Sequence, residues 1–391
     1  MSFFEIWLLL FTFWSFFSLF LLFRALHDSS IAFQINDDHA PLSAPLPESP
    51  PSPQKISIFK PTPPLSTSFS FDFESILPPL ESFLSQMTKD HEMLLGISKR
   101  DFPAWQKIVD HWKTAYPQTT IKVIHENDHS LYSNPKIDWN HTLSKEAQGD
   151  LWLWSDLDIT VAPHYLHHLT LEWNLAPSGY LTNAYHIPTV HQCWGIWDAL
   201  FLHFEFLPGV FLLHKRNRFH TAFGAGILFP AQTFAYSSAW NQIGNHLADD
   251  FHLARLIGHG RLSHMLVQTT SRASSFREGF WHYLRWHKTV RWCDPCGYAG
   301  LFLLLPLLGS LFASVWSLQA LRITAAAWLL ELLIGGIILF KTVKPLSLKM
   351  LPPLLLWPWL RLFAWIWSWL PTSVKWGGTD WNSPIKSTPG K

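Results

Sequence analysis

Residues 151–158 read Leu-Trp-Leu-Trp-Ser-Asp-Leu-Asp, an apolar run that ends in two aspartates two positions apart. A short apolar run of this kind is typical of a strand that is buried on both faces. Such strands belong to parallel sheets covered by helices, which bind ligands beyond the carboxyl ends of their strands. Asp156 and Asp158 stand at that end. The stretch therefore indicates both a fold class and the place of its site.

Other short apolar runs precede this strand and alternate with helix-like stretches. We expect strands at residues 56–59, 93–97 and 120–124, and helical structure around 82–87 and over 103–116. Strands that alternate with helical patterns argue for an α/β domain with a mostly parallel sheet. The sequence contains neither of the familiar Gly-rich phosphate loops.

The composition favours a protein that is partly embedded in a membrane. Hydrophobic residues make up 48% of the 391 residues and charged residues only 15%. Twenty-three Trp and 30 Phe fit rings that lie at membrane interfaces. The net charge of +1 gives no electrostatic argument for binding nucleic acid. Three cysteines do not indicate a disulfide framework and fit a reducing compartment.

The N-terminal residues 3–23 are almost unbroken Leu, Phe, Trp and Ile. About 20 such residues suffice to cross the hydrocarbon core of a bilayer as a helix. A cleavable signal peptide is the alternative, but the stretch lacks a positive start and a small-residue cleavage site. We expect an uncleaved anchor at 1–24, followed by a Pro/Ser-rich linker at 25–54.

Three more apolar blocks lie near the C-terminus, at residues 297–317, 323–340 and 351–370. The last block contains Arg361 and three prolines, so it is either a kinked span or a helix in the membrane plane. We therefore expect a membrane region at 293–372, with two spans and this third element, and a tail at 373–391. Basic residues lie beside the spans on the side of the 55–292 domain and the 341–350 loop, which predicts a multi-pass protein whose catalytic domain faces the cytoplasm.

Two acidic motifs suggest chemistry. Carboxylates two apart at a strand end, such as Asp156 and Asp158, suit a divalent cation that bridges phosphates, although an acidic loop is a common alternative. Asp249 and Asp250 begin an amphipathic helical stretch, where acids complement the helix dipole. Asp250 could equally be a general base that takes a proton from a hydroxyl. Just before it, residues 224–229 predict a strand whose glycines let the backbone approach a ligand.

A third motif, His282-Tyr-Leu-Arg285-Trp286, precedes the second apolar block. His282 and Arg285 are three residues apart and share a face if the stretch is helical. An imidazole and a guanidinium there could bind a pyrophosphate, with Trp286 at the membrane interface. The alternative is a juxtamembrane basic stretch that touches anionic head groups.

The order of these motifs resembles glycosyltransferase family 21, the ceramide glucosyltransferases and their bacterial relatives that act on hopanoids. The likeness runs from about Ile56 to the end of the chain. It includes the opening strand that ends Lys60-Pro61 and the segment Asn134-Pro135-Lys136. It also covers the acidic motifs at 154–159 and 248–251, the His-x-x-Arg-Trp run, and Trp376 in the tail.

The resemblance implies a GT-A-type domain, a UDP-sugar donor, a Mn²⁺ or Mg²⁺ cofactor and an inverting displacement onto a lipid hydroxyl. Asp250 would be the catalytic base, and Asp156 and Asp158 would hold the metal. The residues implied to bind the donor or its diphosphate are Lys60, Asp101, Lys136, Asp156, His282, Arg285 and Trp286. The lipid would be ceramide or a hopanoid-like acceptor.

One position departs from the family pattern. Lys99 stands where the first acidic motif is expected, and Asp101 either replaces that acid or caps the following helix. A non-catalytic membrane protein that binds nucleotide sugars is therefore the alternative from another class. A channel or transporter is disfavoured, because the spans carry few polar residues able to line a path.

Overall fold

The computed structural model describes residues 54–62, 73–125, 131–215, 220–271, 273–305 and 318–386, together with Phe13, Phe17 and Phe20. The chain divides into two compact units. A sheet unit contains residues 39–185, 218–269 and 375–391, and a helical unit contains residues 1–38, 186–217 and 270–374. The N-terminal anchor expected at 1–24 lies outside the described residues apart from the three phenylalanines, which are helical.

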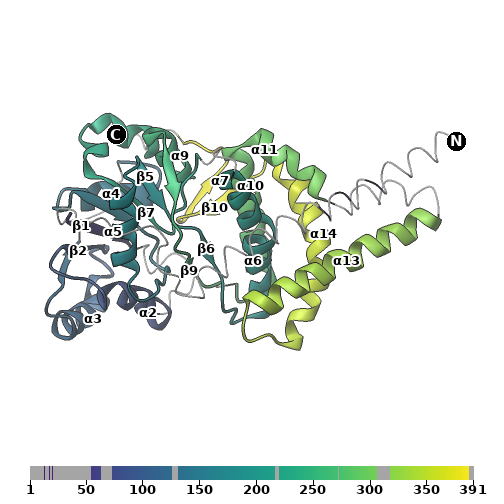
Figure 1. The fold of residues 1–391 in the computed structure, drawn as a ribbon, viewed down its shortest axis with the longest axis horizontal. Coiled ribbons are helices and arrows are strands. Elements are labelled where there is room, and N and C mark those ends of the chain that lie inside the picture. Colours follow the sequence, from purple (N-terminus) through teal and green to yellow (C-terminus); the bar gives the residue numbers. More distant parts are fainter. Residues whose placement is uncertain are drawn as a thin grey trace. The chain divides into compact units, whose positions relative to one another are not determined.

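The sheet unit is built on a seven-stranded sheet in the order β3-β2-β1-β4-β7-β5-β8 (Figure 1). Its strands are β1 (Ile56–Pro61), β2 (His91–Gly96), β3 (Thr120–Ile124), β4 (Leu151–Trp154), β5 (Tyr180–Thr182), β7 (Ile227–Pro230) and β8 (Gly260–Leu262). Neighbouring strands are parallel except that β7 is antiparallel to both β4 and β5. The four strands expected from the sequence are thus present, and the sheet is mostly parallel.

The strand order places a topological switch point between β1 and β4. The chain moves outward from β1 to β2 and β3, and then returns to the other side of β1 to form β4. Crossover connections that leave in opposite directions open a space at the carboxyl ends of the two central strands. Phe59 forms the last pair of β1 with Trp154 of β4, so Lys60 near the end of β1 lies beside Ser155, which follows β4.

The sequence of β4 explains why this strand is central. Leu151 and Leu153 belong to the aliphatic core, which also includes residues of β1, β2, α2 and α5. Trp152 and Trp154 enter an aromatic cluster with Phe229, Phe234 and Trp240, in which the Trp154 and Trp240 ring centroids are 5.8 Å apart. Both faces of the strand are therefore buried, as the uninterrupted apolar run predicts.

Helices pack around the sheet (Figure 1). Those of the sheet unit are α2 (Phe73–Leu84), α3 (Phe102–Ala115), α4 (Pro135–Ser144), α5 (Tyr165–Leu175), the 3₁₀ turn η3 (Ala231–Phe234), α8 (Ser237–Ile243) and α9 (Asp249–Ile257). Two short two-stranded sheets contain β6 (Tyr185–His186) with β9 (Val267–Gln268), and β10 (Val374–Trp376) with β11 (Thr379–Trp381).

The helical unit contains the long apolar helices. Its helices are η1 (Cys193–Gly195), α6 (Ile196–Leu200), the π-helical segment η2 (Phe201–Phe206), α7 (Leu207–Lys215), α10 (Phe276–Cys293), α11 (Pro295–Gly300), η4 (Leu301–Leu304), α13 (Leu318–Thr342), η5 (Leu348–Met350) and α14 (Leu351–Ser368). The buried Arg361 of α14 pairs with Glu331 of α13 and, at 3.5 Å, with Glu205 of η2. Ionic groups therefore join three apolar helices in this unit.

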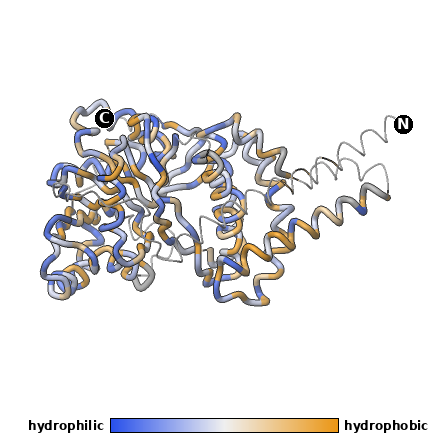
Figure 2. Tube along the Cα trace, in the orientation of Figure 1, coloured by the Kyte–Doolittle hydropathy of each residue, from blue (hydrophilic) through white to orange (hydrophobic). Residues whose placement is uncertain are grey.

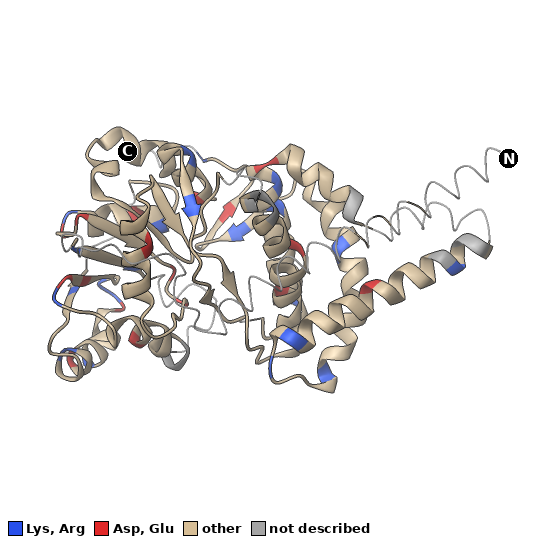
Figure 3. Ribbon diagram, viewed as in Figure 1, with Lys and Arg blue, Asp and Glu red and all other residues tan. Residues whose placement is uncertain are grey.

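Among the described helices, one meets the length and hydropathy expected of a membrane span, over Thr324–Thr342 of α13. Figure 2 shows α13 as largely hydrophobic, and Figure 3 shows charged residues at few of its positions. The block expected at 351–370 forms the helix α14, with Pro358 inside it, and does not meet that criterion. The block at 297–317 begins with α11 and η4, and its residues 306–317 lie outside the described part.

The division into units differs from the continuous domain expected at 55–292. Residues 186–217 and 270–292 cluster with α13 and α14, and the tail from Lys375 clusters with the sheet. The cause is tertiary packing, since the apolar helices α6, η2 and α10 contact α13 or α14. Local composition does not reveal such long-range partners.

A buried carboxylate stabilises the parallel half of the sheet. Glu92 of β2 accepts hydrogen bonds from Ser57 Oγ of β1 at 2.6 Å and from the Gln148 backbone N–H at 2.5 Å. It also pairs with Lys122 of β3 at 2.9 Å. Burial alone would raise the pKa of Glu92, but these hydrogen bonds and the Lys122 charge lower it below its ordinary value. The ionised form is therefore favoured in the folded state.

We expect Glu92→Gln to reduce the free energy of unfolding by about 2 kcal/mol near pH 7, because a charged hydrogen-bond acceptor is lost. A carboxyl whose pKa is lowered by folding stabilises the protein above its unfolded-state pKa of about 4.3 and loses that effect as the pH falls further. The difference between wild type and variant should therefore shrink in acid. Urea unfolding at several pH values measures it, with the exposed Glu146→Gln as control. An equal difference at pH 3 and pH 7 would contradict this assignment.

Candidate active site at the carboxyl ends of β1 and β4

The end of β1 supports the loop that carries the aspartates. The Lys60 ammonium donates to Ser155 Oγ at 3.0 Å and to the Asp156 carbonyl at 2.9 Å, and lies 3.9 Å from the centre of the Phe83 ring. Lys60 has no exposed surface. Burial lowers its pKa to about 7, against the pull of Asp156 and Asp158. The structure thus shows that Lys60 supports the loop that carries the aspartates, and its expected part in binding the donor or its diphosphate stays a prediction.

The segment Asn134-Pro135-Lys136 begins helix α4. The Asn134 side chain caps the helix by accepting hydrogen bonds from the backbone N–H groups of Lys136 at 2.9 Å and Ile137 at 3.3 Å. Pro135 occupies the first helical turn, where its missing N–H costs nothing. The cap fixes the direction in which the Lys136 side chain leaves the helix.

The Lys136 ammonium lies between two carboxylates from different parts of the chain. Its Nζ is 2.6 Å from Asp156 Oδ1 and 3.2 Å from Asp249 Oδ2. Burial alone would lower the pKa of Lys136, but the carboxylates of Asp156, Asp249 and Asp250 raise it well above its ordinary value. Lys136 is therefore a permanent positive charge at the centre of an acidic cluster, which we define as Asp156, Asp158, Asp249 and Asp250.

Asp250 is held by backbone N–H groups at the start of α9. Its Oδ2 accepts from Gly224 N at 2.9 Å and its Oδ1 from Phe251 N at 2.8 Å. Burial, followed by the Asp249 charge, raises the pKa of Asp250 to about 7, while Lys136 and the two N–H groups act in the opposite direction. A carboxylate with a pKa near neutrality is suited to accept a proton and release it again.

Gly224 brings the backbone before β7 against the acidic cluster. A Cβ at this position would lie 2.8 Å from both Asp156 Oδ2 and Lys136 Nζ, closer than a Cβ atom approaches other heavy atoms. Its carbonyl also accepts from the Asp156 N–H at 3.0 Å. The strand predicted at 224–229 is observed over Ile227–Pro230, and the glycine before it serves the site.

The pair Asp156 and Asp158 fits a divalent cation. The Asp156 side chain is 42% exposed although Lys136 holds one of its oxygens. Asp158 Oδ2 accepts from Thr269 Oγ1 at 3.0 Å, which orients the carboxylate as outer-shell partners of metal ligands do. Within the described residues no three or more His, Cys, Asp or Glu side chains are arranged so that they could hold one metal ion together. A cation held by these two aspartates would take its remaining oxygen ligands from a diphosphate and water.

His282, Arg285 and Trp286 lie on α10 in the helical unit. The His282 Nδ1 is 2.8 Å from Asp198 Oδ1 of α6, and Asp198 Oδ2 accepts from Ser271 Oγ at 2.5 Å. The His282 and Trp286 ring centroids are 4.6 Å apart. The buried Asp198 thus fixes the orientation of the half-exposed His282 ring.

The position expected to carry the first acidic motif follows β2. Lys99 is exposed, and Asp101 is buried with its Oδ2 accepting from Ser98 Oγ at 2.7 Å. Asp101 stands at the N-cap position of α3 but its side chain makes no capping hydrogen bond. The structure therefore gives the alternative of a helix cap no support.

Several residues of the site were not predicted from the sequence. Ser155 and Thr269 are ordinary polar residues whose role depends on the distant Lys60 and Asp158. Asp198 could have been noticed, because a single acid in the apolar run of residues 196–204 needs a buried partner. The Asn-Pro step likewise matches a helix start, which indicates that Lys136 lies in the first turn of a helix.

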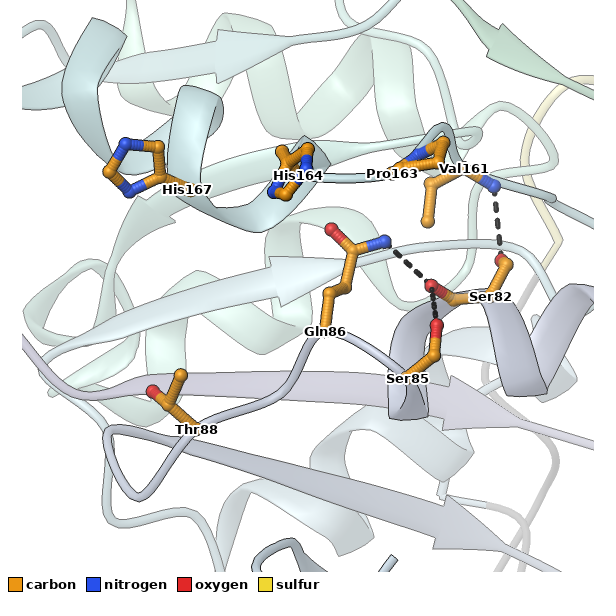
Figure 4. A pocket seen from close by; sticks show the side chains of 8 residues that line it. All are labelled: Ser82, Ser85, Gln86, Thr88, Val161, Pro163, His164 and His167. Atoms are coloured by element: carbon orange, nitrogen blue, oxygen red, sulfur yellow. Dashed lines mark hydrogen bonds between the residues drawn. The ribbon is translucent and has the colours of Figure 1, made fainter.

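A separate cavity of about 560 Å³ lies between α2 and the start of α5 (Figure 4). It is lined by Ser82, Ser85, Gln86, Thr88, Val161, Pro163, His164 and His167. Gln86 and Ser82 bind across it to the backbone at residues 161–166. None of its lining residues belongs to the acidic cluster.

Comparison with known proteins gives the class. The sequence pattern of Glycosyl transferase family 21 matches residues 22–383. Among solved structures, the mannosyltransferase PcManGT from Pyrobaculum calidifontis, in complex with GDP-Man and Mn²⁺, has a TM-score of 0.48 at 14% identity, covering 94% of this chain and 100% of that one. S. aureus TarS 1–349 in complex with UDP-GlcNAc has a TM-score of 0.36 at 12% identity, covering 86% and 98%. No curated protein sequence matches the chain.

The family match, which covers most of the chain, decides the class: the protein is a glycosyltransferase. More narrowly, the chain belongs to glycosyl transferase family 21. The family that the ordered motifs resemble is thereby confirmed.

The electrostatic coupling around Asp250 is testable without an activity assay. We expect Asp249→Asn to lower the pKa of Asp250 below about 7, because a neighbouring negative charge is removed. Lys136→Met should raise it, because an opposite charge is removed. Infrared titration of the carboxylates measures both shifts, after subtraction of the spectrum of Asp250→Asn. A shift in the same direction for both variants would contradict the arrangement.

Proposed function

We propose that this glycosyltransferase moves a hexose from a UDP-sugar to the hydroxyl group of a lipid, with ceramide as the acceptor that we favour. The observation that carries the proposal is the Asp250 carboxylate, held by two backbone N–H groups beside the Lys136 charge. A base with a pKa near 7 is suited to activate an alcohol. Its position by the carboxyl ends of β1 and β4 is where open α/β sheets bind ligands.

The reaction is an inverting single displacement. Asp250 takes the proton of the acceptor hydroxyl as its oxygen attacks the anomeric carbon of the sugar. The bond between that carbon and the diphosphate oxygen breaks as the new glycosidic bond forms, and its electrons leave with UDP. The proton remains on Asp250 until solvent removes it, so one glycoside, UDP and one proton are produced.

The departing diphosphate needs positive charge. Lys136 supplies a fixed charge beside Asp156, and Asp156 with Asp158 would hold Mn²⁺ or Mg²⁺. A bound divalent cation would neutralise the charge that develops on the leaving group. Lys60 supports the aspartate loop from beneath, so its contribution to donor binding is indirect. Asp101 is the acid closest in sequence to the expected first motif and completes the proposed donor site.

The acceptor is proposed to meet the site at a membrane. The apolar Thr324–Thr342 segment of α13 fits a span by length and composition. His282, Arg285 and Trp286 are proposed to hold the donor or the acceptor near the bilayer surface, with the catalytic domain facing the cytoplasm, where nucleotide sugars are made. We also propose that residues 1–24 anchor the chain in the membrane and that the protein crosses the membrane several times.

Asp250→Asn tests the base directly. We expect its kcat to fall about a thousandfold, because a general base contributes 10²- to 10⁴-fold to a transfer of this kind. Membranes that contain the protein are incubated with labelled UDP-sugars and with ceramide or hopanoid acceptors. UDP binding should be retained. Full transfer by the variant would refute the assigned mechanism, and UDP binding without turnover by the wild type would favour a non-catalytic binding protein.

Removal of divalent cations tests the role of Asp156 and Asp158. We expect EDTA to abolish transfer and Mn²⁺ or Mg²⁺ to restore it, because the leaving diphosphate loses its main counter-charge. Asp158→Asn should raise the Mn²⁺ concentration that gives half-maximal activity. The same assay with Asp110→Asn, a change on the exposed face of α3, is the control. Undiminished activity in EDTA would exclude a required cation.

A further inference from the structure

The last described residues of the chain return to the sheet unit. Residues 375–391 cluster with it, and β10 and β11 form a hairpin that turns at Gly377 and Gly378. Both glycines have positive φ, of 58° and 76°, a backbone conformation that residues with a Cβ rarely adopt. The turn is therefore fixed by the sequence, and we refer to residues 375–386 as the tail.

The tail pairs with the loop that leads to Asp250, which we define as residues 244–248. The Leu247 N–H donates to the Pro384 carbonyl at 3.0 Å, and the Lys386 N–H donates to the Asn245 carbonyl at 3.0 Å. These two bonds flank an antiparallel bridge between His246 and Ile385. The loop is thus bonded to the tail along one edge, as a short strand would be.

The opposite edge of the loop is bonded to the segment that positions Lys136. The Asn134 N–H donates to the Gly244 carbonyl at 3.0 Å, and the Asn134 side chain donates to the His246 carbonyl at 2.8 Å. The Ser133 N–H donates to Asn245 Oδ1 at 2.9 Å. The loop therefore lies between the tail and the residue that caps α4.

Side chains anchor the tail in this position. Trp381 is fully buried, and the Lys386 ammonium lies 4.9 Å from the centre of its ring. A Cβ at Gly377 would lie 2.7 Å from Pro135 Cγ, so the hairpin turn abuts the residue between Asn134 and Lys136. The tail thus contacts both the loop before Asp249 and Asp250 and the start of α4.

We propose that the tail is a positioning element of the transfer reaction. It holds the loop at residues 244–248, and through it sets the place of Asp250 relative to Lys136. The inference rests on the proposed role of Asp250 as base. A carboxylate that moves by about 1 Å from its productive position can lose up to about a hundredfold in rate. The loop after β4 has supports outside the tail, since Lys60 donates to Ser155 Oγ and the Asp156 carbonyl and Thr269 donates to Asp158, so donor binding depends less on the tail.

A matched pair of variants at one position tests this. Lys386→Pro removes the N–H that bonds to Asn245, whereas Lys386→Ala keeps it, and both remove the side chain over Trp381. We expect Lys386→Pro to lower kcat about tenfold or more, with the KM for the donor changed less than threefold. Lys386→Ala should retain transfer within about threefold of wild type. Equal loss in both variants, or full transfer by Lys386→Pro, would overturn the proposal.

Hydrogen exchange of the purified full chain gives a readout that does not depend on activity. Lys386→Pro should increase exchange at the Leu247 amide and over residues 244–248, with Lys386→Ala close to wild type. Unchanged protection in Lys386→Pro would overturn the proposal about the tail, whether or not the wild type shows transfer. Absence of transfer by the wild type would instead count against the proposed function. If Lys386→Pro fails to fold, Gly377→Ala in the full chain replaces it, because a Cβ there displaces the hairpin turn from Pro135. A lowered kcat with little change in the KM for the donor supports the proposal, and unchanged kcat contradicts it.

Discussion

The arrangement of the site depends on the ion pairs of Lys136. One ammonium joins the loop after β4, through Asp156, to the first turn of α9, through Asp249. Carboxylates gathered so closely would repel one another and take up protons without that charge. The free-energy cost of burying the Lys136 ammonium is offset by its carboxylate partners. Removing one partner of such a buried ion pair is strongly destabilising, because the remaining charge is left buried and uncompensated. The cap by Asn134, the glycine at 224 and the support from Lys60 all serve to hold this centre.

The helical unit also contains buried charged groups that are paired with partners from other elements. Arg361 is buried among apolar helices and persists there because Glu331 and Glu205 pair with it. Asp198 is buried in the same unit and is satisfied by Ser271 and His282. In both units a few charged groups fix the relative positions of elements that apolar packing alone would leave less specific. The family's sequence motifs mark only some of these groups.

The sequence was sufficient to predict the parts that depend on local pattern. The apolar run at 151–154 predicts β4, because a strand buried on both faces consists of consecutive apolar residues. The alternation of strands and helical stretches before it predicts the mostly parallel sheet. The pairing of Lys60 with Ser155, of Asp198 with His282 and of the tail with Leu247 could not be predicted, since the partners lie tens of residues or more apart. The assignment of residues 186–217 to the helical unit has the same cause.

The central claim is that a nucleoside diphosphate binds at the carboxyl ends of β1 and β4, against the acidic cluster and Lys136. An experimental structure of the protein with UDP and Mn²⁺ tests it most directly. The expected result is Mn²⁺ on the carboxylates of Asp156 and Asp158, bridged to the diphosphate, with the Lys136 ammonium directed at a phosphate oxygen. UDP bound elsewhere, or bound with no metal on these aspartates, would contradict the claim.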